Sequence, residues 1–281
     1  PDHEGLGGEF VSVTLMGGFA GRAAPMPDFN DPALYETVLS GDLARNDGPN
    51  WTGRDDNSFT VLSIASAVVM NLTIRGASGG TPDSAGGAIT GSSYLGSAIE
   101  LDRCRIVDNQ SDYSAVLHGF PNGRVTMIAR NTTIENNRGT GFAPNSIIAA
   151  ERVSWERCTI RGNTLAAGSG ALMSCLWFEC ADSLIAGNSV DQAAVLTASQ
   201  SAQIRNNTLV QNRSGRGMLM DLLFPGPLTV EANIVHPGLG PCLPLAAHTT
   251  TCQRVRTLQL YDSRRRILNN CSLTAGTGVG N

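Results

Sequence analysis

Lysine is absent from this 281-residue sequence, and all twenty of its basic side chains are arginines. Without lysine the chain offers no Schiff-base amine, no lysine base and no phosphate-loop lysine. Aromatic residues make up only 5% of the chain, and no apolar run reaches the roughly 18 residues that a membrane-spanning helix needs. The net charge of −4 gives no reason to expect binding to nucleic acid or to an anionic membrane surface.

Histidine is scarce, and its four copies are scattered at positions 3, 118, 236 and 248. Metal ligands must be clustered at short spacing, so we expect no metal site, and nothing in the sequence calls for a cofactor. Seven cysteines leave at least one unpaired. Cys242 with Cys252 is the expected disulfide, because both lie in an irregular segment; Cys271 could replace either partner, and Cys175 with Cys180 is a weaker second choice.

A repeat dominates what the sequence does contain. An Ile or Leu marker stands three residues before an Asn five times, at Ile106, Ile134, Ile160, Ile185 and Leu209. Weaker copies flank the series at Ile74 and Ile234, and consecutive markers are 32, 28, 26, 25, 24 and 25 residues apart. A period this short indicates a stack of similar units, each of which buries its apolar face only against its neighbours.

The unit is too short and too poor in helix formers for paired helices, whereas Val, Ile, Thr and small residues alternate in it as they do in strands. The positions two, five and seven residues before each marker are mostly apolar or small and should point inward. We therefore predict an all-β fold, a right-handed parallel β-helix of about eight or nine rungs. The marker asparagines are expected to form a structural ladder of side-chain amides at one corner: Asn109, Asn137, Asn163, Asn188 and Asn212.

One domain is expected over residues 1–281, with regular rungs at 61–235. Residues 22–57, rich in Pro, Asp and Asn, should form a long loop over the side or end of the stack. The period is lost at 236–281, which should form an irregular C-terminal cap. The chain reads as a processed one, because it starts without Met or a signal-like segment. Its N-terminal rung is expected to dock on further polypeptide or on a second subunit.

Two pairs of segments carry a resemblance to a known family. Gly86-Gly87-Ala88-Ile89 followed by Ile106-Val107-Asp108-Asn109, and Gly170-Ala171-Leu172 followed by Ile185-Ala186-Gly187-Asn188, resemble the GGA[IL] and FxxN repeats of polymorphic outer-membrane proteins. The wider group is the bacterial right-handed β-helix proteins of the pectin-lyase-like superfamily. The resemblance covers roughly residues 10 to 235 and departs from the pattern in having Ile or Leu for Phe. It implies a protein that is secreted or displayed on the bacterial cell surface.

Catalysis in that superfamily needs converging carboxylates, for calcium or for acid and base, often with an Arg or Lys. Successive rungs instead place Asp102, Arg130 and Glu156 in one column, where opposite charges should pair on a solvated face. Glu100 and Glu179 share a column, but the rung rise sets them about 14 Å apart. Catalytic residues therefore stay unassigned. The weak candidates are Asp42, Asp47, Asp55 and Asp56 in the long loop, and His118, which is more typical of a surface or corner residue.

Two functions remain open, because the superfamily includes lyases, hydrolases, adhesins and autotransporter passengers. The favoured hypothesis is an exported non-catalytic β-helix that serves as a surface, adhesion or assembly element. The alternative is a polysaccharide lyase or glycoside hydrolase that acts on an extracellular polysaccharide, with its site built by the long loop over an early rung. Cleavage assays on acidic and neutral polysaccharides, with and without calcium, separate the two hypotheses.

Overall fold

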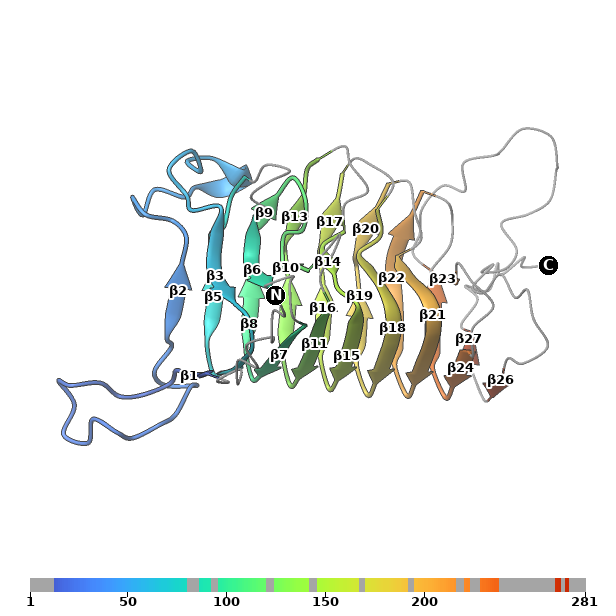
Figure 1. Ribbon diagram of the computed structural model, residues 1–281, viewed down its shortest axis with the longest axis horizontal. Coiled ribbons are helices and arrows are strands. Elements are labelled where there is room, and N and C mark those ends of the chain that lie inside the picture. The colour runs from blue at the N-terminus through green and yellow to red at the C-terminus, as the bar shows by residue number, and fades with distance from the viewer. Residues whose placement is uncertain are drawn as a thin grey trace, which may run out of the picture.

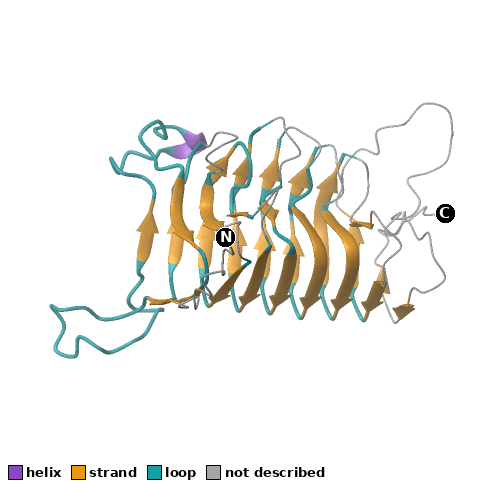
Figure 2. Ribbon diagram, in the orientation of Figure 1, coloured by secondary structure: helices purple, strands orange, loops and turns teal. Residues whose placement is uncertain are grey.

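The computed structural model describes residues 13–79, 86–91, 96–119, 124–141, 146–166, 170–191, 195–215, 220–222, 228–237, 266–268 and 271–272. They form a parallel β-solenoid whose turns follow one another along the long axis of the molecule (Figure 1). Strands dominate these residues, and their one helical segment is the short 3-10 helix η1 (Pro49–Trp51) (Figure 2). No helix in the described part is long and apolar enough to cross a membrane.

The strands line up in four faces, in each of which a strand pairs in parallel with its counterpart in the neighbouring turn. Face 1 contains β1 (Val13–Met16), β4 (Ala67–Met70), β7 (Ser97–Asp102), β11 (Val125–Arg130), β15 (Arg152–Glu156), β18 (Met173–Ala181), β21 (Leu196–Arg205), β24 (Leu228–Glu231) and β26 (Arg266–Leu268). Face 2 contains β2 (Val38–Ser40), β5 (Thr73–Arg75), β8 (Arg105–Val107), β12 (Thr133–Glu135), β16 (Thr159–Arg161), β19 (Leu184–Ala186), β22 (Thr208–Ser214), β25 (Ile234–Pro237) and β27 (Cys271–Ser272).

Two shorter faces close each turn. Face 3 contains β9 (Gln110–Ser111), β13 (Arg138–Gly139), β17 (Thr164–Leu165), β20 (Ser189–Val190) and the end of β22. Face 4 contains β3 (Thr60–Ile64), β6 (Gly87–Gly91), β10 (Leu117–His118), β14 (Ile148–Ala149), the first halves of β18 and β21, and β23 (Met220–Leu222).

The predicted fold class, an all-β parallel solenoid, is confirmed. Among the described residues, five successive turns, those that start at β7, β11, β15, β18 and β21, place a strand in all four faces. The two turns before them and the two after them contribute strands to fewer faces, so the count of complete turns is below the predicted eight or nine. The repeat marker reports only the corner between faces 2 and 3, and it therefore also counted turns that are incomplete elsewhere.

Each turn bends sharply at two corners where one residue adopts a left-handed backbone. Between faces 1 and 2 these residues have φ of 50–56° and are Asn71, Arg103, Asn131, Arg157, Asp182, Asn206 and Ala232. Between faces 2 and 3 they have φ of 52–62° and are Asp108, Asn136, Gly162, Gly187 and Gln211. Asn, Asp and Gly, which tolerate this conformation best, supply most of the positions. The composition of the corners thus explains why short strands alternate with abrupt changes of direction.

The inward positions predicted from the repeat are confirmed, because the residues two, five and seven places before the markers Ile74 to Leu209 are all buried. Trp155 and Phe178, from adjacent turns, meet edge to face at 5.2 Å between ring centroids. The position expected for the last marker, Ile234, was wrong. Val235, and not Ile234, is in register with Leu209, and Ile234 is 44% exposed. A shift of one residue moves a strand side chain to the opposite face.

The marker asparagines form a continuous ladder along one corner. In each step a side-chain Nδ2 donates to the Oδ1 of the next asparagine, at 2.9–3.0 Å from Asn109 through Asn137, Asn163 and Asn188 to Asn212. The same Oδ1 also accepts the backbone N–H of the preceding asparagine. The first four side chains are completely buried. The ladder therefore satisfies backbone groups that the sharp corner would otherwise leave unpaired inside the protein.

A second polar ladder occupies the other corner. The repeat predicted the positions of Ser183 and Asn207 only as inward and mostly apolar or small, and it gave no role to Asn233. The Ser183 hydroxyl accepts the backbone N–H of Cys158 at 3.0 Å, Asn207 Oδ1 accepts that of Ser183 at 2.9 Å, and Asn233 Oδ1 accepts that of Asn207 at 2.8 Å. In the sequence, this second ladder could have been recognised from polar residues that stand at inward positions otherwise occupied by apolar residues. Together the two ladders link every turn from the one that contains Asn109 to the one that contains Asn233 through side-chain hydrogen bonds.

Two segment boundaries differ from expectation. The range 22–57, expected as one long loop, contains β2, which pairs with β5 as part of the stack. A strand of only three residues carries too little alternation to be recognised in a Pro- and Asp-rich context. In 236–281, expected as an irregular cap, β26 and β27 continue faces 1 and 2. The expected disulfide between Cys242 and Cys252 lies outside the described residues.

Substitution of a central ladder asparagine should be far more destabilising than substitution at the end of the ladder. Asn163→Ala removes an amide that accepts from Asn137 and donates to the next turn, and it leaves the buried backbone N–H of Asn137 unpaired, so we expect a loss of about 3 kcal/mol or more in the free energy of unfolding. Asn212→Ala is the matched control: it takes the same acceptor from Asn188, but at the half-buried end of the ladder, where water can replace the lost bond, so it should cost about 1 kcal/mol. Urea denaturation measures both, and equal losses would contradict a cooperative ladder.

Candidate functional site

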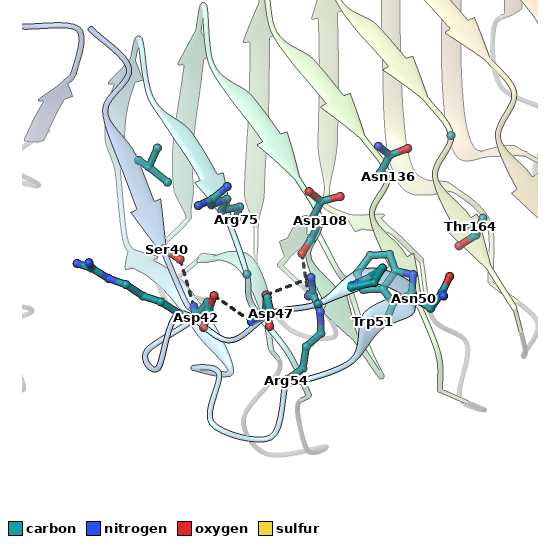
Figure 3. A pocket seen from close by; sticks show the side chains of 16 residues that line it. Ser40, Asp42, Asp47, Asn50, Trp51, Arg54, Arg75, Asp108, Asn136 and Thr164 are labelled. Atoms are coloured by element: carbon teal, nitrogen blue, oxygen red, sulfur yellow. Dashed lines mark hydrogen bonds and ion pairs between the residues drawn. The ribbon is translucent and has the colours of Figure 1, made fainter.

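A groove of about 980 Å³ runs along the corner between faces 2 and 3 (Figure 3). One wall is the loop that joins β2 to β3, which contributes Asp42, Asp47 and Trp51. The floor consists of corner residues from successive turns: Ser40, Arg75, Asp108, Asn136 and Thr164. These five residues belong to five consecutive turns, so the groove extends about 19 Å along the axis at about 4.8 Å per turn.

The loop carboxylates that were candidates for catalysis hold the loop together. The carboxylate of Asp42 accepts the backbone N–H groups of Asn46 and Asp47 at 3.1 and 3.3 Å. The carboxylate of Asp56 accepts the backbone N–H of Ala44 at 2.8 Å. Asp55 is exposed and does not line the groove. Of the four loop candidates, the structure therefore brings only Asp42 and Asp47 to the groove, and it gives both of them a loop-building role.

Asp47 and Arg54 join the loop to the stack. Arg54 Nη2 lies 3.2 Å from Asp47 Oδ2, and its Nη1 donates to the backbone carbonyl of Asp108 at 2.9 Å. The Asn57 amide donates to both oxygens of Asp47 and to the carbonyl of Gly76 at 2.7 Å. The Arg54 side chain is only 9% exposed. No pattern in the sequence distinguishes Arg54, because it is a lone arginine in a polar loop.

Trp51 lies beside this arginine in the groove wall. The Arg54 guanidinium carbon is 4.4 Å from the centre of the indole ring, and that of Arg138 is 5.9 Å away. Trp51 and its neighbour Asn50 both have positive φ, of 65° and 56°. An aromatic residue rarely adopts this conformation, which costs on the order of 1 kcal/mol, so the cation–π contact with Arg54 helps to hold the ring in place.

Asp108 supplies the half-buried carboxyl of the groove floor. Burial raises the pKa of this carboxyl above its usual value, and the charges of Arg54 and Arg105 oppose that rise only in part. A carboxyl with a raised pKa near arginines suits a general acid or a hydrogen-bond donor to a ligand oxygen. The sequence placed Asp108 inside a repeat motif as a corner residue, so its chemistry depends on the loop that packs against it.

Glu135, on the outer side of face 2, is clamped between two arginines of adjacent turns. Arg105 Nη2 and Arg161 Nη2 lie 2.7 and 2.6 Å from its two oxygens, and the Glu135 side chain is only 5% exposed. Burial alone would raise the pKa of Glu135, but the hydrogen bonds and charges of the two arginines outweigh it and hold the pKa below its usual value. The charge is therefore satisfied within the stack.

The charged column on face 1 pairs differently in detail from its prediction. Arg130 is in register with both Asp102 and Glu156. Its side chain contacts Glu156 and, on the diagonal, Glu100, each at 3.5 Å. Asp102 instead pairs with Arg103 at 3.1 Å, because the corner places that residue beside it. All these side chains are at least partly exposed and neutralise one another.

His118 and the cysteines lie away from the groove. His118, in β10, packs edge to face against Tyr113, with 6.4 Å between the ring centres. Cys104, Cys158, Cys175 and Cys180 are free and buried, so the second-choice disulfide between Cys175 and Cys180 is wrong. Burial raises the pKa of Cys104 to about 11 and that of Cys175 to about 12. These thiols act as small apolar side chains. Within the described residues, no group of three or more His, Cys, Asp or Glu is arranged to hold a metal ion.

Removal of the Glu135 charge should lower stability in a pH-dependent way. Because its pKa is lowered in the folded state, its contribution is present above the usual value of 4.5 and is lost as the pH falls through the folded-state value. We expect Glu135→Gln to cost about 1 to 3 kcal/mol at neutral pH, and the difference from wild type to shrink in acid. Glu156→Gln, in an exposed pair, is the control and should cost at most about 1 kcal/mol. A constant loss at all pH values would contradict this account.

The Asp108→Asn substitution should change the stability at neutral pH in the opposite direction to Glu135→Gln. Because the pKa of Asp108 is raised in the folded state, its protonated carboxyl is the form that the fold favours. The resulting stabilisation is present below the usual value of 3.8 and is lost as the pH rises through the folded-state value. The amide carries no charge to desolvate, and Asn also tolerates the left-handed backbone. We expect equal stabilities in acid and a variant more stable by up to about 0.5 kcal/mol at neutral pH, measured by urea denaturation. A variant less stable than wild type at neutral pH would show that the ionised form is favoured.

Comparison with known proteins identifies the family. The family model described as the right-handed β-helix region matches residues 85–253, more than half of the chain. The match includes the floor residues Asp108, Asn136 and Thr164, whereas the loop with Asp47 and Arg54 lies before it. Searches of curated proteins and of solved structures found no match. The matched residues and the parallel solenoid agree, and the chain belongs to the right-handed β-helix family.

Proposed function

We propose that this chain is an exported, non-catalytic β-helix that serves as a surface or adhesion element and holds an extracellular polysaccharide in the groove. The observation that carries the proposal is the state of the loop carboxylates. Asp42 and Asp47 line the groove, but both already accept hydrogen bonds from the loop, and Asp47 is also paired with Arg54. Carboxylates engaged in this way suit a rigid binding surface better than proton transfer.

The lining of the groove supports a saccharide as the ligand. Trp51 offers an aromatic ring, and Ser40, Asn136 and Thr164 offer hydroxyl and amide groups on the first, fourth and fifth of the five turns that form the floor. Aromatic rings pack against the apolar faces of sugar rings, while small polar groups bond to their hydroxyls. Three acidic and three arginine side chains line the groove, namely Asp42, Asp47, Asp108, Arg45, Arg54 and Arg75. This balance accommodates both neutral and mildly acidic chains.

Location outside the cell is part of the same proposal. It is supported by the resemblance of the repeats at Gly86–Ile89 and Ile106–Asn109 to those of polymorphic outer-membrane proteins. A stack in which each turn is bonded to the next by backbone and asparagine amides is also a rigid spacer, which a surface element needs.

A polysaccharide lyase or glycoside hydrolase is the second candidate, and Asp108 is the observation that favours it. Its carboxyl has a raised pKa and shares the groove with Arg54 and Arg75, as a general acid would. In that case Asp42 or Asp47 would have to give up loop contacts to act as the second carboxylate.

Binding and cleavage assays distinguish the two candidates. We expect affinity electrophoresis to show retention by one of a panel of acidic and neutral polysaccharides, with no release of reducing or unsaturated ends, with or without calcium. Trp51→Ala should weaken retention several-fold, because it removes the ring from the groove. Trp177→Ala is the matched control: that ring also stacks on an arginine, Arg152, at 5.3 Å, but lies outside the groove. Turnover that Asp108→Asn abolishes would establish the enzyme instead.

A further inference from the structure

The Asp108 carboxyl differs from the other carboxylates that line the groove. Asp42 accepts two backbone N–H groups, and Asp47 is paired with Arg54. In the part of the chain that the structure describes, no hydrogen bond or ion pair reaches the Asp108 carboxyl, because the bond from Arg54 goes to the backbone carbonyl of Asp108 instead. The residue is nevertheless half-buried in the groove floor. A ligand in the groove can therefore meet this carboxyl without displacing a contact.

Three guanidinium groups act on this carboxyl from the elements around it, and two of them are committed to other carboxylates. Arg54, in the loop, lies 3.2 Å from Asp47. Arg105, in β8, lies 2.7 Å from Glu135 in β12, and the charge of Glu135 raises the pKa of the carboxyl further. Arg75, in β5, is exposed, so water screens its charge. The other charged side chains of the groove region are Asp42, Arg45 and, against the Trp51 ring, Arg138. Among the described residues, the carboxyl thus has no dedicated cationic partner.

The open groove already favours the protonated form of Asp108 more than water does. Burial raises the pKa of this carboxyl, and the three guanidinium groups lower it only in part, so the pKa stays above its usual value. A saccharide that lies in the groove removes further water from the carboxyl and frees neither of the committed arginines. An ionised carboxylate then loses hydration, whereas a protonated carboxyl can donate a hydrogen bond to a sugar oxygen. An occupied groove should therefore favour the protonated form still more.

We propose that a polysaccharide binds in the groove together with one proton, which Asp108 takes up, and that retention therefore strengthens in mild acid. This inference rests on the proposed function and concerns the regulation of the same site. The binding of the proton and of the ligand are reciprocally linked, so a ligand that favours the protonated carboxyl binds most tightly to the protonated groove. Affinity should be greatest below the pKa of Asp108 in the open groove, and it should fall as the pH rises toward the higher pKa of the occupied groove.

Retention on bead-immobilised polysaccharides over a range of pH tests the coupling. The probes are a neutral β-glucan, a galactomannan, polygalacturonate and alginate. We expect the wild-type chain to bind at least one of these probes several-fold more tightly at about pH 4 than at about pH 7. Calorimetric titration of the wild type with the same polysaccharide, in two buffers of different ionisation enthalpy, should show a net uptake of protons on binding.

Asp108→Asn is the diagnostic variant, because its amide is always neutral, donates hydrogen bonds and tolerates the left-handed backbone. Its retention by the neutral probes should not change with pH, and at neutral pH it should exceed that of the wild type several-fold. For the acidic probes, the ratio of the two retentions cancels the titration of the polysaccharide's own carboxylates. Asp55→Asn is the matched control: it removes an exposed loop carboxylate that does not line the groove, so it should keep the wild-type pH profile.

Failure of the proposed function and failure of this inference give different results. Circular dichroism at each pH first establishes that the wild type and both variants are folded. If no probe is retained at any pH, the proposed function fails and this inference fails with it. If a probe is retained equally at all pH values, less in acid, or with the same pH profile by Asp108→Asn, only this inference is overturned. Retention of Asp108→Asn at neutral pH that is no stronger than that of the wild type would also overturn it.

Discussion

The hydrogen bonding of buried corners is the constraint on which the rest of this structure depends. A chain that turns sharply every few residues leaves backbone N–H groups inside the protein that no strand ladder reaches. Here a side-chain oxygen from the following turn supplies the missing acceptor: Asn163 Oδ1, for example, accepts both the backbone N–H and the side-chain amide of Asn137. Each turn is therefore completed by its successor. Each turn therefore depends on its neighbours for stability, and the first and last turns of the stack have a neighbour on one side only.

The same corners determine where a ligand can bind. Left-handed residues such as Asp108 and Asn136 leave the strand direction at equal intervals and place their side chains outside the stack. A loop that packs over them closes a groove whose floor repeats with the turns, and Arg54 fastens it through the carbonyl of Asp108. The site is therefore composite: its floor is a by-product of the repeat, and its wall and much of its electrostatics come from a single irregular loop.

The repeat was enough to predict the class of fold, the inward positions and the residues of the asparagine series, because the same local environment recurs in it many times over. It failed where a feature occurs once. The strand at Val38–Ser40, the one-residue shift to Val235 and the pairing of Arg130 with Glu100 have no second copy that could reveal them. The groove was decided by tertiary structure alone. Asp108 belongs to a repeat and Arg54 to a loop 54 residues away. Burial raises the pKa of the Asp108 carboxyl and the charge of Arg54 lowers it, and both effects depend on what surrounds the carboxyl in space and not on its neighbours in the chain.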